Sequence, residues 1–279
     1  LRLDRPRLSV DIRGRHPETR FPAEPGRLLE PSGLRVLHFF LTRPDVINLP
    51  YRSIARDSAV SPATVSIVMR ELRAGGFLAA AGPDRVRLER RRDLIDIFIR
   101  GYSLKLRPPA LLGRFRHRES DPGRILGHLV PNFQSEQARW ALTGGIAAHR
   151  LTRHLKPDDL AVFVDPTGYE VVLDERMLSD PTGGNVTVLD LFARSVIADV
   201  DSGTPTEPLA TPLLVYAELV HLGGPREIET AGMILEAPPG DRVPAWIRRI
   251  VLQGLRADPD GRHASMEALL SALSRDPAA

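Results

Sequence analysis

The segment 51–70, YRSIARDSAVSPATVSIVMR, limits the fold of this chain more than any other stretch. It contains a short helical pattern, 51–58, and most of a second, 62–74, with only three residues between them. Two helices joined by so short a turn cannot continue in line and must pack across each other. The segment therefore predicts a helix-turn-helix.

The residue types inside the two helices support this prediction. Ile54 in the first helix and Val65 and Val68 in the second are spaced so that they can face one another. Ser61 stands at the N-cap of the second helix and Pro62 at its first helical position, where a missing N–H costs nothing. The second helix is therefore expected to be anchored from behind, with its other face directed outward.

Ala59 occupies the turn between the two helices, where glycine is the more common residue. The turn is expected to require a positive φ angle at this position. Alanine adopts such an angle at the cost of mild strain, because its Cβ atom crowds the backbone there.

Further patterns on both sides of this helix pair complete a larger unit. A helical pattern at 34–41 precedes it, and two short stretches, 77–78 and 85–88, follow it on either side of a Gly-Pro-Asp turn at 82–84 and are expected to form a hairpin. Three helices followed by a hairpin form the element order of a winged helix. In that arrangement the second helix of the pair lies in the major groove of DNA.

The side chains expected to face DNA fall into two groups. Those on the outer side of the second helix would approach base edges, where an arginine can contact guanine in a bidentate manner, and arginines of the first helix and the hairpin would contact phosphates. Together the candidate DNA-binding residues are Arg52, Arg56, Ser61, Ala63, Thr64, Ser66, Ile67, Arg70, Arg85 and Arg87. A three-helix unit with a hairpin can also be purely structural or bind protein, and this alternative stays open.

The distribution of charge favours DNA over that alternative. Residues 1–118 contain 24 Lys+Arg and 12 Asp+Glu, a net charge of +12, whereas residues 119–279 contain 14 and 23, a net charge of −9. A basic half of this kind suits a polyanionic partner. The run Arg90-Arg91-Arg92 either adds to this surface or begins a solvated helix, and the sequence leaves both interpretations open.

The chain is expected to consist of five segments and to have an α+β fold. The segments are a flexible basic arm at 1–30, the winged helix-turn-helix at 31–90, a connecting helix and linker at 91–130, a mixed α/β domain at 131–237 and a helical tail at 238–279. The mixed domain is expected to contain strands at 160–165, 170–173, 185–189 and 196–200. Its expected helices are 135–143, 146–155, 209–222 and 226–236.

The central block has the outline of a polymerase-β-like nucleotidyltransferase, in which Gly-Gly opens a helix and a strand bearing carboxylates follows. Here Gly144-Gly145 follows an apolar run, and Asp158-Asp159 precedes a strand. The chemistry needs two carboxylates two residues apart, so that both point to one side of the strand and share metal ions. Asp159 is followed two residues later by Ala161, so that pairing is absent. The domain is either a degenerate, inactive relative of that fold or an unrelated fold.

No other arrangement in the sequence indicates catalysis or metal binding. Asp165 and Glu170 could form a nuclease-like acidic pair, but the lysine expected two residues beyond is Val172. His149 and His154 are five residues apart and so do not share one helical face. We therefore expect no catalytic residue, no metal ion and no cofactor.

Several stretches, in their order along the chain, resemble the AbiEi family of type IV toxin–antitoxin antitoxins. They are AGGFL at 74–78, DLIDIFIRGYSLKLRP at 93–108, LLGRF at 111–115, RWALTGGIAAHRLTRHLKP at 139–157, GNV at 184–186 and ATPLLVYAELVHLGGPREIETAGMI at 210–234. The resemblance covers roughly residues 34–237. It implies a bacterial repressor that binds double-stranded DNA at the operator of its own operon. It also implies a C-terminal domain that opposes a separately encoded nucleotidyltransferase toxin.

The end of the chain, 243–279, resembles instead the last helices of a bacterial Ser/Thr kinase C-lobe. The motifs that a kinase needs, a glycine-rich loop with a strand lysine, His-Arg-Asp and Asp-Phe-Gly, are absent from the sequence. Kinase activity is therefore excluded.

The remaining features concern the compartment and the competing hypotheses. Cysteine is absent, no apolar stretch approaches 18 residues, and the N-terminal charges are scattered, which together favour a cytoplasmic protein without a membrane partner. Two further functions stay open beside the repressor. One is a nucleotidyltransferase acting on nucleic acid or protein, and the other is an adaptor whose winged helix binds protein. The oligomeric state stays open as well.

Overall fold

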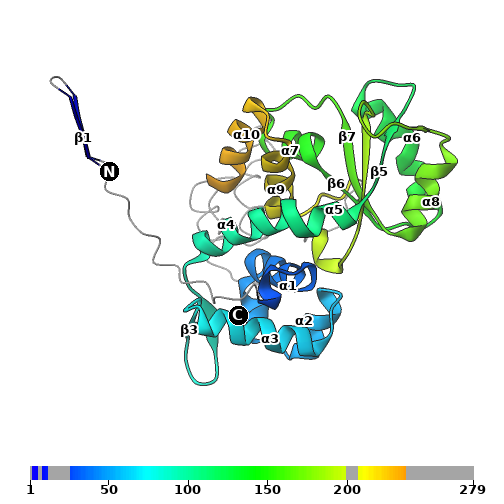
Figure 1. Ribbon diagram of the computed structural model, residues 1–279. Helices are drawn as coiled ribbons and strands as arrows, with labels where there is room; N and C mark the ends of the chain where they lie inside the picture. Colours follow the sequence, from blue (N-terminus) through cyan, green and yellow to red (C-terminus); the bar gives the residue numbers. More distant parts are fainter. Residues whose placement is uncertain (1, 6–7, 12–25, 199–206, 237–279) are drawn as a thin grey trace, which may run out of the picture. The chain divides into compact units, whose positions relative to one another are not determined.

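The computed structural model describes residues 2–5, 8–11, 26–198 and 207–236, and the chain divides into two compact units, Leu1–Pro108 and Pro109–Ala279 (Figure 1). Helices and strands occur in both units, which confirms the expected α+β class. Among the described helices, none combines the length and the apolar character needed to cross a lipid bilayer.

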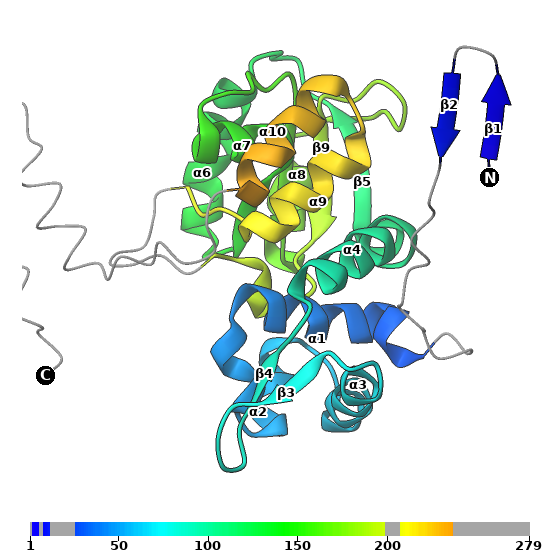
Figure 2. The ribbon, with the colours of Figure 1, turned by 90° about the vertical axis from the view of Figure 1, so that its left-hand side faces the viewer.

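The first unit is built on three helices and a hairpin. The helices are α1 (Pro31–Thr42), α2 (Tyr51–Asp57) and α3 (Pro62–Ala74), and the hairpin pairs β3 (Leu78–Ala80) with β4 (Val86–Leu88) in antiparallel fashion. A 3-10 helix, η2 (Pro44–Asn48), joins α1 to α2. Figure 2 shows the hairpin extending from the group of three helices. The expected order of elements is therefore present, and α3 has the bounds that the sequence predicted.

The core of this unit is the apolar seam between its helices. Leu34 and Leu37 of α1, Ile54 of α2 and Val65 and Val68 of α3 are all fully buried. These are the positions that helical periodicity selected, because residues three and four apart lie on one side of a helix.

The segment expected to be a flexible arm contains regular structure. Residues 2–5 and 8–11 form an antiparallel hairpin, β1 with β2, and Arg27–Leu29 form a 3-10 helix, η1. The carboxylate of Glu71 on α3 accepts hydrogen bonds from the backbone N–H groups of Arg27 (2.9 Å) and Leu28 (2.8 Å). Residues 27–30 thus belong to the helical unit, and their attachment depends on a tertiary contact that local sequence does not contain.

Helix α4 (Arg91–Gly101) follows the hairpin and continues through a π-helical turn, η3 (Tyr102–Leu106), into α5 (Arg107–Ala110). Helix α4 packs closely on α1 at Gly101. A Cβ atom on Gly101 would lie 2.6 Å from a methyl group of Leu34, so a larger residue there would require the Leu34 side chain to move. The connecting helix predicted at the start of the segment 91–130 is therefore part of the first unit's core.

The second unit is a five-stranded sheet with helices on both faces. Its strands are β5 (Leu111–Arg116), β6 (Trp140–Thr143), β7 (Leu160–Val164), β8 (Leu178–Ser179) and β9 (Val186–Asp190), in the order β6-β7-β9-β5-β8. Only β7 and β9 are parallel. Helices α7 (Gly144–Thr152), α9 (Pro212–Leu222) and α10 (Pro225–Glu236) pack together on one face, and α6 (Pro122–Ser135) and α8 (Pro166–Asp174) on the other (Figure 1).

Several expectations for the second unit were wrong. Residues 170–173, expected as a strand, lie in helix α8, because Asp165 caps that helix through a hydrogen bond from the Gly168 N–H (2.9 Å). The linker expected up to residue 130 contains β5 and the first part of α6. The helix expected at 135–143 is instead the end of α6 followed by β6, and all four residues of β6 are buried. A fully buried strand shows no alternation, so periodicity cannot distinguish it from a helix.

Two more segments differ from expectation or cannot be compared. The strand expected at 196–200 is a 3-10 helix, Arg194–Val196, followed by a single bridge from Ile197 to Ala210. Residues 199–200 and the helical tail from 238 onward lie outside the described residues. The strands expected at 160–165 and 185–189 and the helices expected at 209–222 and 226–236 are confirmed within a few residues at each end.

A buried histidine lies in the core of the first unit. His38 of α1 is fully buried, and its ring lies 5.7 Å from that of Phe98 on α4. Burial, together with the nearby positive charge of Arg43, lowers the pKa of His38 from 6.5 to about 3. The imidazole is therefore neutral in the folded protein at neutral pH.

We predict that the stability of the first unit falls as the pH drops below 6.5. The unfolded chain takes up a proton at His38 near pH 6.5, whereas the folded chain resists doing so until about pH 3. Between these values the free energy of unfolding should fall by up to about 1.4 kcal/mol per pH unit. Thermal melting of wild type and His38→Phe across this range tests it, since the variant should show a shallower decline. Parallel curves would contradict the prediction.

Candidate nucleic-acid interface

The turn between α2 and α3 has the predicted geometry. The backbone N–H of Ser58 donates to the carbonyl of Ile54 (2.9 Å) and that of Val60 donates to the carbonyl of Ala55 (2.9 Å), which closes the end of α2. Ala59 has a φ angle of 52°, as predicted for this turn. An alanine in the left-handed region is strained, because its Cβ approaches the carbonyl oxygen.

The start of α3 is capped as the sequence predicted. Ser61 is extended at the N-cap, Pro62 is the first helical residue, and the Ser61 hydroxyl accepts a hydrogen bond from the Thr64 N–H (3.2 Å). The hydroxyls of Ser61 and Thr64 lie 3.0 Å apart and form a second hydrogen bond. This local network fixes the direction in which α3 leaves the turn.

The structure divides the residues predicted to face DNA from α3 into exposed and buried ones. Ser61, Ala63, Ser66 and Arg70 are exposed. Thr64 is buried, with 9% of its surface exposed, so the expectation that it faces outward was wrong. It supports the cap instead, and Ile67 is half-buried at the edge of the core. Helical spacing gave both positions an outward direction, but neighbouring side chains cover them.

The arginines predicted on α2 and α3 differ in their partners. Arg52 and Arg70 are exposed and form no ion pair within the described part of the chain. Arg56 lies 3.1 Å, from Nε to the carboxylate, from Asp57, and this hydrogen bond and charge raise the pKa of Arg56. Arg73, one turn beyond Arg70 on α3, is also exposed, and sequence reasoning did not select it.

The hairpin β3–β4 has the place of the wing, and we use that name for residues 78–88. Its two predicted contacts, Arg85 and Arg87, are both exposed. Arg87 pairs with Glu89 at 2.7 Å, whereas Arg85 forms no ion pair with any described residue. The two arginines flank Val86, so their positions depend on how that residue is held.

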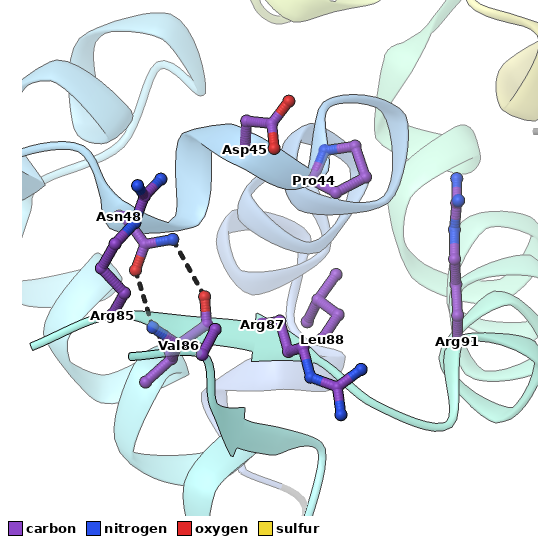
Figure 3. Close-up of a pocket in the computed structure, with 9 residues that line it drawn as sticks. Pro44, Asp45, Asn48, Arg85, Val86, Arg87, Leu88 and Arg91 are labelled. Atoms are coloured by element: carbon purple, nitrogen blue, oxygen red, sulfur yellow. Dashed lines mark hydrogen bonds between the residues drawn. The ribbon is translucent and has the colours of Figure 1, made fainter. Parts of the chain in front are cut away.

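Asn48, at the end of η2, holds the wing at Val86. Its side-chain amide donates to the carbonyl of Val86 (2.9 Å), and its side-chain carbonyl accepts from the Val86 N–H (2.9 Å) (Figure 3). Val86 directs these two groups away from β3, since residues alternate along an antiparallel pair and the bonds across the hairpin are made at Arg85, to Ala81, and at Glu89, to Phe77. Sequence reasoning missed Asn48, since nothing in the local pattern pairs residues 38 positions apart.

The run 90–92, left open by the sequence, contains three arginines with three different roles. Arg90 adopts a φ of 50°, pairs with Asp93 at 2.7 Å and lies over the ring of Phe77, 5.0 Å from its centroid. Arg91 is half-buried and donates to the carbonyl of Leu41, and burial lowers its pKa. Arg92 is exposed. Only Arg92 therefore fits the interpretation of the run as a solvated start of a helix.

The nucleotidyltransferase outline in the second unit can be compared residue by residue. Gly144 and Gly145 open α7, as that outline requires, and Gly144 has a positive φ of 58°. The strand register places Ala161 of β7 opposite Thr143 of β6 and Thr187 of β9. Paired residues share a face of the sheet, so the strand positions nearest to Asp159 on that face hold no carboxylate.

Asp159 itself lies in a mostly buried environment. Burial raises its pKa, and the charges of Glu218 and Asp158 add to the effect, while the guanidinium of Arg114 opposes it. Glu218 projects from α9 and is 1% exposed.

The other acidic and histidine candidates are separated by the fold. Asp165 caps α8, and Glu170 lies exposed inside that helix, so they do not form an acidic pair on one strand. His149 contacts the carbonyl of Leu155 (2.8 Å), and His154 lies 3.4 Å from Glu229. Within the described ranges, no group of three or more His, Asp or Glu residues has an arrangement that could hold a metal ion.

Comparison with known families adds the biological context. The chain is an α+β protein of the transcriptional-regulator class: its residues 87–238, more than half of the sequence, match a family model described as "Transcriptional regulator, AbiEi antitoxin, Type IV TA system". The chain therefore belongs to the AbiEi antitoxin family. No curated protein and no solved structure matches it. The matched range begins in β4, so helices α1, α2 and α3 lie outside it.

We predict that Ala59→Gly stabilises the first unit. Glycine adopts the observed φ of 52° without strain, so the free energy of unfolding should rise by about 1 kcal/mol despite the greater freedom of glycine in the unfolded chain. Chemical denaturation measures the change. The same substitution at Ala63, an exposed position in the first turn of α3, is the control and should lower stability by up to about 1 kcal/mol. A loss of stability at both positions would argue against strain at Ala59.

Proposed function

We propose that the first unit is a winged helix-turn-helix that binds double-stranded DNA and represses the operon encoding this protein. The observation that carries the proposal is the division of α3 into two faces. Val65 and Val68 are fully buried, while Ser61, Ser66 and Arg70 are exposed on the other side. A capped helix anchored in this way can place its N-terminal half in a major groove.

The charge around α3 supports a polyanionic partner. Arg52, Arg70 and Arg85 come from three different elements and are all exposed without an ion pair among the described residues. Membership of a family of transcriptional regulators points the same way. Guanidinium groups that come from three elements and lack a carboxylate partner in the described part of the chain are available to neutralise phosphates of a duplex.

The exposed residues suggest separate roles in binding. Arg70 is assigned to base reading, because a guanidinium contacts guanine O6 and N7 in a bidentate manner. Ala63 and Ser66 are small enough to allow close approach of the helix. Arg52 and Arg85 are assigned to phosphates. Arg56 and Arg87 already hold carboxylates, so a phosphate would have to compete with Asp57 or Glu89.

We predict that Arg70→Ala and Arg85→Ala weaken DNA binding in different ways. Arg70→Ala should remove about 1–3 kcal/mol of discrimination between operator and random DNA. Arg85→Ala should weaken binding to both DNAs alike and make the dependence of affinity on salt less steep. Gel shifts with the DNA upstream of the gene, repeated at several salt concentrations, test both. Equal losses on both DNAs for Arg70→Ala would rule out its base-reading role.

For the second unit we propose an antitoxin role without transferase activity. The family is one of type IV antitoxins, and we infer that the opposed toxin is a separately encoded nucleotidyltransferase acting in the cytoplasm. The position two residues after Asp159 is Ala161, so the strand lacks the pair of carboxylates that would share metal ions. Incubation with labelled nucleoside triphosphate and Mg²⁺ should therefore give no transfer beyond that of an Asp159→Ala variant.

We predict that the two roles can be separated by mutation in the full chain. A variant carrying Arg70→Ala and Arg85→Ala should fail to repress a reporter under the protein's own promoter, because both changes lie in the first unit. The same variant should still protect cells that express the nucleotidyltransferase encoded next to the gene. Loss of protection at equal protein level would contradict the assignment of protection to the second unit.

A further inference from the structure

A groove of about 310 Å³ lies in the first unit between η2, the wing and the start of α4 (Figure 3). Three arginines and one carboxylate line it: Arg85 and Arg87 of the wing, Arg91 of α4, and Asp45 of η2. Figure 3 shows Arg87 between Arg85 on one side and Arg91 on the other. Positive charge therefore dominates the groove, even though Arg87 also pairs with Glu89.

Arg91 has a donor that the described protein does not satisfy. One of its terminal nitrogens donates to the carbonyl of Leu41, which fixes the guanidinium beside the groove. Its Nε–H is buried and has no acceptor. A buried donor without an acceptor is unfavourable in a folded protein. The half-buried guanidinium of Arg91 also lines the basic groove, where an anion can accept from its other donors.

The walls of the groove limit the kind of anion that fits. Pro44 and Leu88 provide apolar surface beside the guanidinium groups, and no aromatic side chain lines the groove. A base or another planar ring would find nothing to stack on. A phosphodiester with its deoxyribose matches this combination, because the sugar is largely apolar and the phosphate accepts from guanidinium forks.

The groove keeps its shape because Asn48 joins its two sides. An isolated two-stranded hairpin is at best marginally stable, and the strands of the wing have only three residues each. The two hydrogen bonds from Asn48 to Val86 tie β4 to η2. Arg85 and Arg87, the neighbours of Val86, are thereby held on the same side as Arg91.

We propose that this groove binds a backbone phosphate of the DNA duplex, with Arg91 as a phosphate contact and Asn48 as the positioning residue of the wing. The proposal rests on the proposed DNA binding and adds to it a contact outside α3 and the wing. Phosphate contacts carry no sequence information but fix the register of a protein on the duplex. The groove would therefore orient α3 relative to the DNA strand next to the wing.

The first test compares Arg91→Gln with Arg92→Gln in the full chain. The two residues are adjacent on α4, but only Arg91 lines the groove, and Arg92 is exposed. Arg91→Gln should weaken binding to operator DNA about tenfold at low salt. It should also lower the slope of log affinity against log salt by about 1, as expected for the loss of one phosphate contact. Arg92→Gln should leave the slope unchanged. Equal slopes for the two variants at unchanged melting temperature would overturn the proposal.

The second test separates positioning by Asn48 from a general structural role. Asn48→Ala should lower the salt slope by about 2, because both wing arginines lose their place. In a chain that already carries Arg85→Gln and Arg87→Gln, the further change Asn48→Ala should have no effect on the slope. A loss of affinity of the same size in both backgrounds would show that Asn48 acts through overall stability, and the positioning role would be wrong.

The third test uses the protein without DNA and distinguishes the sources of phosphate. Inorganic phosphate and AMP are titrated separately while the arginine Nε–H signals are followed by NMR. Inorganic phosphate should shift the signal that disappears in Arg91→Gln, at millimolar concentration, and AMP should bind no more tightly. Micromolar binding of AMP would identify a small-molecule site and overturn the DNA assignment. If the wild-type protein binds no DNA, the proposed function is wrong. A shift of the Arg91 signal on addition of phosphate would then show an anion-binding site that has no role in DNA binding.

Discussion

The burial of one stripe of α3 is the constraint on which the first unit depends. Val65 and Val68 are fully buried, and with them the helix acquires a fixed rotation about its own axis. The cap formed by Ser61 and Thr64 fixes where the helix starts. Once rotation and start are set, the direction of every outward side chain follows from the helical repeat. The exposed polar edge is therefore a consequence of core packing and needs no separate stabilisation.

The wing is tied to η2 as well as to the end of α3, where the Phe77 N–H donates to the carbonyl of Leu72. Three-residue strands provide too few ladder bonds to hold a hairpin against the helices. Asn48 adds two hydrogen bonds at the outer edge of β4, and the guanidinium of Arg90 covers the ring of Phe77 at the base of β3. The two basic parts of the unit, α3 and the wing, are thus held by different contacts. Because these contacts are separate, loss of the Asn48 hydrogen bonds would release the wing without changing the packing of α3.

Features that depend on neighbouring residues could be predicted from the sequence, whereas features that depend on contacts between distant residues could not. Helix α3 was predicted with its observed bounds because its signals, Ser61-Pro62 at the start and Gly75-Gly76 at the end, are local. The burial of Thr64 and the attachment of residues 27–30 to Glu71 were not predicted, because they depend on neighbours that only folding brings near. Asn48 was missed for the same reason, and the role of Arg91 within the run 90–92 was left open. In the second unit, β6 was taken for a helix because a completely buried strand has no visible period.

The surroundings of Asp159 show how a chain can match the outline of a nucleotidyltransferase site without having its chemistry. The glycines that open α7 keep their place, and Gly144 packs so closely on β7 that an added Cβ would lie 3.1 Å from that of Ala161. The small residue at 161 thus fits this close packing, whereas a carboxylate there would crowd the start of α7. Nearby, Asp159 is surrounded by Asp158, Glu218 and Arg114, and burial raises its pKa. The close contact between α7 and β7 explains why small residues occupy positions 144 and 161, since close packing alone selects small residues there.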